Sequence, residues 1–209
     1  ADDLTLVELA SDARAFNQAQ GAGGTLVVGM SGLQAAQWVD DVGTTLEPLP
    51  GYFSGIAWDA NTSGVIVGIQ INDLFGMDIP VYWPDVDAPA VELAFPGGTA
   101  GSGGAAFAVN DLGMIAGVAA PTGFFQAVRW DDVNADPVVI GPLEGAVGGE
   151  ARAINARGDI AGRSTFPDLE VRPMLHLRVE DEFVDLGTLG GTFAEALGLN
   201  DARQVVGAS

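Results

Sequence analysis

Residues able to do chemistry are scarce in this chain of 209 residues. It contains one histidine, His176, and no cysteine. Nucleophilic catalysis of the Ser-His or Cys-His type needs a base that a third group orients, and His176 would have to serve alone. A zinc site built from several histidines or cysteines is excluded by the same count. We therefore expect a protein that is not an enzyme.

One acidic segment has the spacing of a calcium ligand set. Asp132, Asn134 and Asp136 alternate within "DDVNADP" (131–137) and offer oxygen atoms, as Ca²⁺ requires. The glycine at the sixth position and the distant bidentate glutamate of the complete motif are absent. The alternative is an acidic hairpin turn. Ca²⁺ at these three residues is the one cofactor that the sequence suggests, and otherwise none is expected.

A second candidate site is the pair Trp58 and Asp59. Asp59 stands at a position where the corresponding segments of the chain carry alanine or glycine. A carboxylate among such small residues is costly to bury without a partner, so it could bind a ligand or cation beside Trp58. The alternative is divergence of one repeat without a function.

These candidates belong to a repeat that runs through the chain. Its main phrase is Asn-x-x-x-x-[Ile/Val]-[Ala/Val]-Gly, which recurs about every 45 residues. Copies begin at Asn61, Asn110, Asn155 and Asn200, and a copy with an insertion begins at Asn17. The sequence Asn-x-x-Gly indicates a tight turn between two strands, because glycine adopts positive φ without strain.

Two further landmarks keep the same spacing. A tryptophan ends "AAQW", "PVYW" and "AVRW" at Trp38, Trp83 and Trp130, and we place Leu177 in the matching position of the fourth unit. A Leu/Gly/Pro phrase follows, as in "LEPLPG" (46–51) and "LGTLGG" (186–191), and "LVELAS" (6–11) fits the same position. We expect the tryptophans to be buried between units.

Four short strands per unit of this length are typical of a β-propeller blade. The fold predicted is all-β: a single five-bladed β-propeller domain over 1–209, with repeats at about 12–54, 55–103, 104–149, 150–194, and 195–209 together with 1–11. In this arrangement the N-terminal strand Leu4–Leu9 joins the C-terminal blade and closes the ring. The alternatives are a three-stranded last blade, a chain that continues past Ser209, and a longer propeller of which this is a fragment.

The charge of the chain is strongly negative. It has 28 acidic and 8 basic residues, a net charge of −20, and no lysine. The basic surface that nucleic acid requires is therefore missing, and no run of apolar residues is long enough to span a membrane. Because the chain begins at Ala1 without a methionine, we expect that a leader was removed and that the protein is exported to the extracellular space or cell surface.

Across nearly the whole chain these phrases resemble the HAF-repeat family of extracellular repeat proteins. "DLGTLGG" (185–191) is similar to the outer phrase of that family, Asn-x-x-Gly-x-[Ile/Val]-x-Gly to its inner phrase, and Trp130 to the tryptophan after its His-Ala-Phe tripeptide. The tripeptide itself is replaced, for example by Gln126-Ala127-Val128. The resemblance implies export and a repeat fold, and it implies no catalytic residue.

The sequence therefore favours a non-catalytic binding or structural module at the cell surface, with a glycan or a surface protein as ligand. Two alternatives remain open. The first is a glycan-active enzyme that uses two carboxylates, for which Asp59 is the one acid that the repeat places suitably. The second is a self-associating subunit of a filament or surface layer.

Overall fold

The computed structural model describes residues 13–21, 24–39, 42–72, 77–98, 103–121 and 123–209, and side chains from Leu26 onward. Within these ranges the chain is all-β, with one short 3₁₀ turn at Pro96–Gly98. No helix in the described part of the chain has the length and apolarity to cross a membrane.

The strands form five antiparallel sheets, and each four-stranded sheet is built from consecutive strands. This confirms the predicted all-β class, and four short strands are present in each of the first four repeats. The first sheet holds β1 (Ala13–Gly21), β2 (Gly24–Ser31), β3 (Gln34–Val39) and β4 (Val42–Thr45). The second holds β5 (Ser54–Ala60), β6 (Ile66–Ile71), β7 (Ile79–Trp83) and β8 (Val91–Glu92). The third holds β9 (Gly104–Val109), β10 (Ile115–Ala119), β11 (Gln126–Trp130) and β12 (Val138–Val139). The fourth holds β13 (Gly148–Ile154), β14 (Ile160–Thr165), β15 (Val171–Leu177) and β16 (Glu182–Asp185), and the last pairs β17 (Glu195–Leu199) with β18 (Val205–Ala208).

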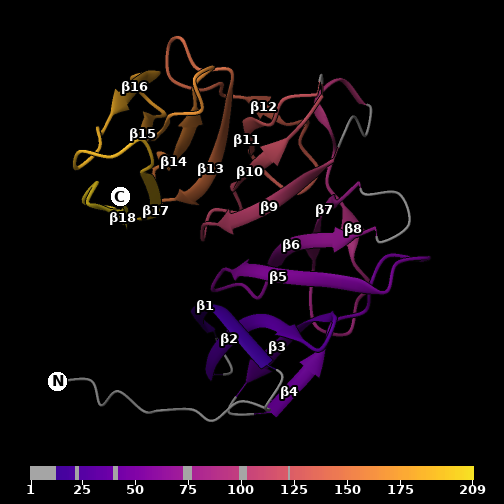
Figure 1. Cartoon of the computed structure of the whole chain (residues 1–209). Coiled ribbons are helices and arrows are strands. Elements are labelled where there is room, and N and C mark those ends of the chain that lie inside the picture. The colour runs from indigo at the N-terminus through magenta and orange to yellow at the C-terminus, as the bar shows by residue number, and fades with distance from the viewer. Residues whose placement is uncertain (1–12, 22–23, 40–41, 73–76, 99–102, 122) are drawn as a thin grey trace, which may run out of the picture.

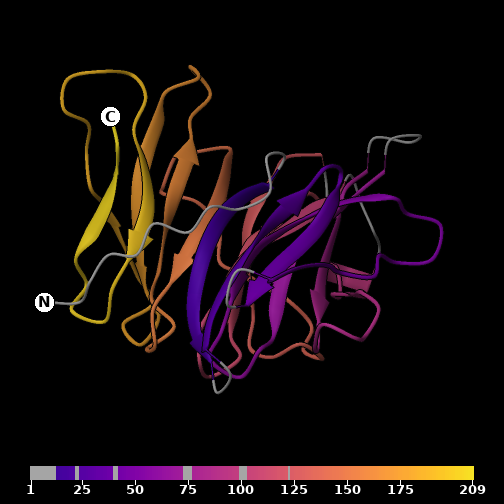
Figure 2. The ribbon, with the colours of Figure 1, turned by 90° about the horizontal axis from the view of Figure 1, so that it is seen from below.

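The five sheets follow one another along an arc in chain order (Figure 1, with a second view in Figure 2). The first strand of each sheet lies on the inner side of the arc, and each first strand contacts the next. Among the described residues no strand pairing joins the last sheet to the first. The predicted closing strand, Leu4–Leu9, lies outside the described residues.

A bulge in the first strand explains the repeated glycine. In every first strand the register shifts at the same place, at Ala57/Asp59 in β5 and Ala151/Ala153 in β13 for example. The bulge pushes a carbonyl oxygen onto the glycine of the second strand. A Cβ on Gly68, Gly117, Gly162 or Gly207 would overlap that oxygen. The last residue of the repeat phrase is therefore fixed by close backbone approach.

The repeat asparagine closes the turn after that bulge and also joins neighbouring sheets. In Asn110, Oδ1 accepts the N–H groups of Leu112 and Met114, while Nδ2 donates to the carbonyl oxygen of Asn155 at 2.8 Å. Asn61 donates to the Asn110 carbonyl at 3.2 Å, and Asn155 donates to the Asn200 carbonyl at 3.4 Å. We call these three hydrogen bonds the asparagine ladder. It links the second sheet to the third, the third to the fourth and the fourth to the last.

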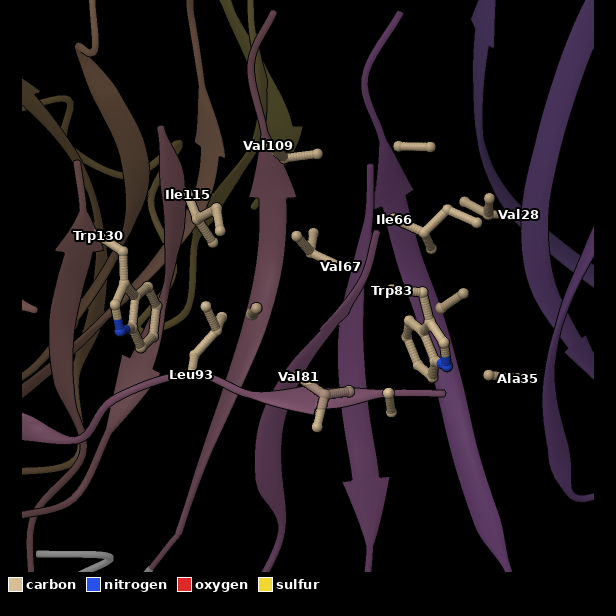
Figure 3. Packing of buried hydrophobic residues seen from close by; sticks show 14 of the residues in the cluster. Val28, Ala35, Ile66, Val67, Val81, Trp83, Leu93, Val109, Ile115 and Trp130 are labelled. Atoms are coloured by element: carbon tan, nitrogen blue, oxygen red, sulfur yellow. The ribbon is translucent and has the colours of Figure 1, made fainter. Parts of the chain in front are cut away.

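The repeat tryptophans are buried, as predicted. Trp83 and Trp130 are fully buried, and each indole N–H donates at 2.8 Å to a carbonyl oxygen of the preceding unit, at Glu47 and Ala94 respectively. Trp130 lies beside Leu93 of that unit, and Trp83 lies between strands of the first two sheets (Figure 3). The apolar cluster around them runs through the first three sheets. These tryptophans therefore pack one sheet on the next.

The strand register corrects two of the sequence alignments. Ala15 pairs with Gly29 as Ala57 pairs with Gly68, so Asn17 corresponds to Asp59 and not to the repeat asparagine. The hairpin of the first unit is longer, because β1 and β2 continue to Gly21 and Gly24.

The second correction concerns the tryptophan position of the fourth unit. Trp130 pairs with Ile115, and His176 pairs with Ile160, which is the corresponding residue of β14. His176, and not Leu177, therefore occupies the tryptophan position. A period that drifts by one or two residues hides both shifts in the sequence.

Candidate functional site

A pocket of about 320 Å³ lies where the second, third and fourth sheets meet. Aliphatic side chains of β5, β6, β9 and β10, together with Gly103 and Gly104, form one part of its lining, and we call the aromatic and charged residues of the lining the rim. The aliphatic wall consists of Ile56, Ile69, Ile71, Ala105 and Val118, and the rim side chains are those of Trp58, Asp78, Phe107, Phe125, Glu150 and Arg152.

Three rim side chains form a continuous stack across the sheets. The rings of Trp58 and Phe107 meet edge to face, with centroids 5.9 Å apart and planes at 72°. The guanidinium carbon of Arg152 lies 4.1 Å from the centroid of the Phe107 ring, which is a cation–π contact. All three side chains are partly exposed, so their surfaces are accessible to a ligand.

The bulge positions these three residues. Trp58, Phe107 and Arg152 are the extra residues of β5, β9 and β13, each between two residues that pair with the second strand. A bulge turns its extra side chain away from the regular alternation of the strand. Consecutive first strands therefore present one side chain each to the same pocket.

Sequence reasoning identified Trp58 and missed Phe107 and Arg152. A signal was available, because each lies between the two small residues of its repeat, at Ala106/Ala108 and Ala151/Ala153.

An ionic chain continues from the pocket toward the last sheet. Glu150 accepts from Arg152 and from Arg163, both at 2.6 Å, and Arg163 also reaches Glu195 at 3.1 Å. These four side chains are largely but not fully buried. The chain holds Arg152 in place on the Phe107 ring, so the charged end of the pocket is preorganised.

Asp59, the other residue of the predicted pair, makes hydrogen bonds to the backbone. Its Oδ2 accepts the backbone N–H of Val109 at 2.8 Å, and its Oδ1 accepts that of Ala60 at 2.8 Å. Asp59 is buried, at 8% exposure. Its carboxylate thus joins the second sheet to the third, while Trp58 beside it lines the pocket. The structure does not bring the two side chains into one site.

The predicted calcium ligands lie in an exposed turn after β11. Asp132 Oδ1 accepts the N–H of Asn134 at 2.8 Å, and the Asp132 carbonyl accepts the N–H of Ala135 at 3.1 Å. Asp85 caps the equivalent turn of the second sheet through the N–H of Asp87. Within the described ranges no three histidine or acidic side chains converge on a possible metal position. In the structure the Asp132 side chain therefore caps its own turn.

His176 is buried at 3% exposure, in the position that tryptophan holds in the first three sheets. Its Nε2 lies 3.1 Å from Asp181 Oδ1, and its ring packs on Phe183 with centroids 4.7 Å apart. Its Nδ1 has no hydrogen-bond partner among the described residues. His176 is not among the residues that line the pocket.

Among the described residues the most deeply buried acid is Asp159, at 0% exposure. Burial alone would raise the pKa of this carboxyl, but hydrogen bonds from Arg203, from Asn155 and from the Arg178 backbone N–H outweigh it and lower the pKa below 3.8. Arg203 belongs to the last unit and lies at positive φ, where the other turns carry glycine. Asp159 therefore anchors the last sheet to the fourth.

This anchor predicts a pH dependence of stability. Because the pKa of Asp159 is lowered by folding, its contribution is complete above the unfolded-state pKa of about 3.9 and is lost as the pH falls through the lower folded-state value. We expect Asp159→Asn to reduce the free energy of unfolding near neutral pH. The difference in free energy between this variant and the parent should become smaller as the pH drops below about 4. Denaturant titrations over this range measure the difference.

Glu144, an exposed acid on the connection before β13, provides the matched control. Glu144→Gln should leave the free energy of unfolding within about 0.5 kcal/mol of the parent at every pH. A gap between Asp159→Asn and the parent that stayed constant as the pH fell would contradict the assignment.

Comparison with known proteins does not assign the chain to a family. No protein-family model matches the chain, and no curated protein is significantly similar to it.

Proposed function

We propose that this chain is a non-catalytic binding module exported to the cell surface, with a protein or a glycan as its ligand. The observation that carries the proposal is the preorganised stack of Trp58, Phe107 and Arg152 on an apolar pocket. Aromatic side chains and arginine held over a concave apolar surface are typical of binding hot spots. The resemblance to the HAF-repeat family supports export.

The test compares two exposed phenylalanines. Phe125 lies on the pocket rim at 49% exposure, and Phe53 lies outside the pocket at 78%. Purified protein is applied to glycan arrays and to immobilised cell-surface proteins. Phe125→Ala should reduce binding at least about tenfold, the effect of losing a residue worth about 1.4 kcal/mol, and Phe53→Ala should not. Equal binding by both variants and the parent would contradict the proposed site.

We also propose that the arc is a five-bladed propeller which Leu4–Leu9 closes beside β18. The support is the repeat itself, because "LVELAS" (6–11) has the phrase that elsewhere accompanies the outer strand. The chain has no cysteine of its own, so any disulfide that forms must join the two introduced cysteines. Cysteines placed in turn at positions 5–9, each with Val206→Cys, should include a pair that forms a disulfide, which requires Cα atoms within about 7 Å. Failure of every pair would contradict closure.

A further inference from the structure

The lining of the pocket is more apolar than polar. Its wall consists of aliphatic side chains, of which Ile69, Ala105 and Val118 are themselves almost completely buried. These aliphatic side chains offer no hydrogen bond to a sugar hydroxyl placed against them, and a hydroxyl buried without a partner is costly. An apolar side chain placed there would lose only water contacts, and this burial is favourable. The wall therefore selects an apolar group.

An exposed phenylalanine lines the pocket, and two further exposed apolar residues are sequence neighbours of lining residues. Phe125 on the rim is half exposed, and its neighbour Phe124 is 61% exposed. Met77, next to the rim residue Asp78, is also exposed, at 37%. Of these three residues Phe125 lines the pocket itself, and an exposed aromatic side chain at a pocket is typical of an interaction site. Such a pocket suits one inserted anchor residue.

The charge around the pocket favours a basic partner. Among the described residues that line the pocket, Arg152 is the single cation, Glu150 pairs with it at 2.6 Å, and Asp78 adds a further acid. The whole chain carries a net charge of −20. A field of this sign accelerates the association of cationic partners and opposes that of anionic ones.

From these three observations we infer that the pocket binds a basic protein segment that inserts one apolar side chain between the second and third sheets. This inference rests on the proposed function, and it narrows the ligand from protein or glycan to a cationic protein. The anchor provides most of the affinity, and the basic flanks provide the rate of association and the sensitivity to salt.

Three labelled peptides of equal length test this inference by fluorescence anisotropy: a central leucine flanked by arginines, the same leucine flanked by glutamates, and a central serine flanked by arginines. The arginine-flanked leucine peptide should bind best, by on the order of tenfold over each of the others. Raising the salt from about 0.05 M to about 0.5 M should weaken its binding by a similar factor. Phe125→Ala should reduce its affinity to that of the serine peptide, and Phe53→Ala should not.

The outcomes separate the inference from the proposed function. Equal binding of the leucine and serine peptides, equal binding of the arginine and glutamate peptides, or binding that Phe125→Ala leaves unchanged would overturn the inference. If glycans on the array nevertheless bound and Phe125→Ala abolished that binding, the proposed function would hold and the inference of a basic protein ligand would be wrong. If no glycan, peptide or surface protein bound in a way that depended on Phe125, the proposed function and the inference would both be wrong.

Discussion

Gly162→Ala is expected to lower the free energy of unfolding by about 3 kcal/mol or more. The Cβ that this change adds would overlap the carbonyl oxygen of Glu150, which the bulge in β13 presses against β14. Neither group is a flexible side chain, so the two strands would have to separate. For a domain of this size the loss corresponds to a fall in melting temperature of about 10 °C, measured by circular dichroism.

Gly191→Ala is the matched control for this prediction. Gly191 is exposed, its φ is not positive, and a Cβ there would find no atom closer than 3.9 Å. The same substitution should therefore change the free energy of unfolding by no more than about 0.5 kcal/mol. Similar melting temperatures for the two variants would show that the bulge does not fix the glycine.

Asn110→Ala should also cost about 3 kcal/mol. The change removes the ladder bond to the Asn155 carbonyl and the two turn bonds from the N–H groups of Leu112 and Met114. Asn110 is buried at 7% exposure, so water cannot fully replace the lost partners. Urea titration of the variant measures the cost.

Asn200→Ala separates the ladder from the turn. Asn200 makes the same two turn bonds, to the N–H groups of Ala202 and Gln204, but its Nδ2 donates to Gln204 Oε1 within its own unit, and the residue is exposed. Its backbone carbonyl, which ends the ladder, is kept in the variant. We expect a loss of only about 1 kcal/mol. Equal losses for both variants would mean that the ladder adds nothing beyond the turns.

The repeat made the sheets predictable because each landmark has one structural cause. The asparagine closes a turn, the glycine accommodates a carbonyl oxygen, and Trp83 and Trp130 bond back to the preceding unit. Such constraints restrict residue type, so they are visible in the sequence. Insertions change spacing without changing geometry, and for this reason Asn17 was aligned two residues away from its true counterpart.

The pocket was much harder to predict. The residue at a bulge is restricted by no backbone requirement, and the repeats carry Trp58, Phe107 and Arg152 there, which share no chemical type. His176 was misplaced for a related reason: its position needs a flat ring to pack, and histidine satisfies this need without the sequence signature of tryptophan. Asp59 was predicted as a site residue because the corresponding positions carry alanine or glycine. In the structure it instead accepts a hydrogen bond from the backbone of the next sheet.

Photo-crosslinking determines whether a ligand enters the pocket between the second and third sheets. A benzophenone amino acid is placed at Phe125 in one protein and at Phe53 in another, and each is irradiated with cell-surface extract and with the arginine-flanked leucine peptide. We expect a peptide adduct at position 125 that a second change, Phe107→Ala, removes, and we expect no adduct at position 53. Adducts of equal yield at both positions, or an adduct at 125 that Phe107→Ala leaves unchanged, would contradict this prediction.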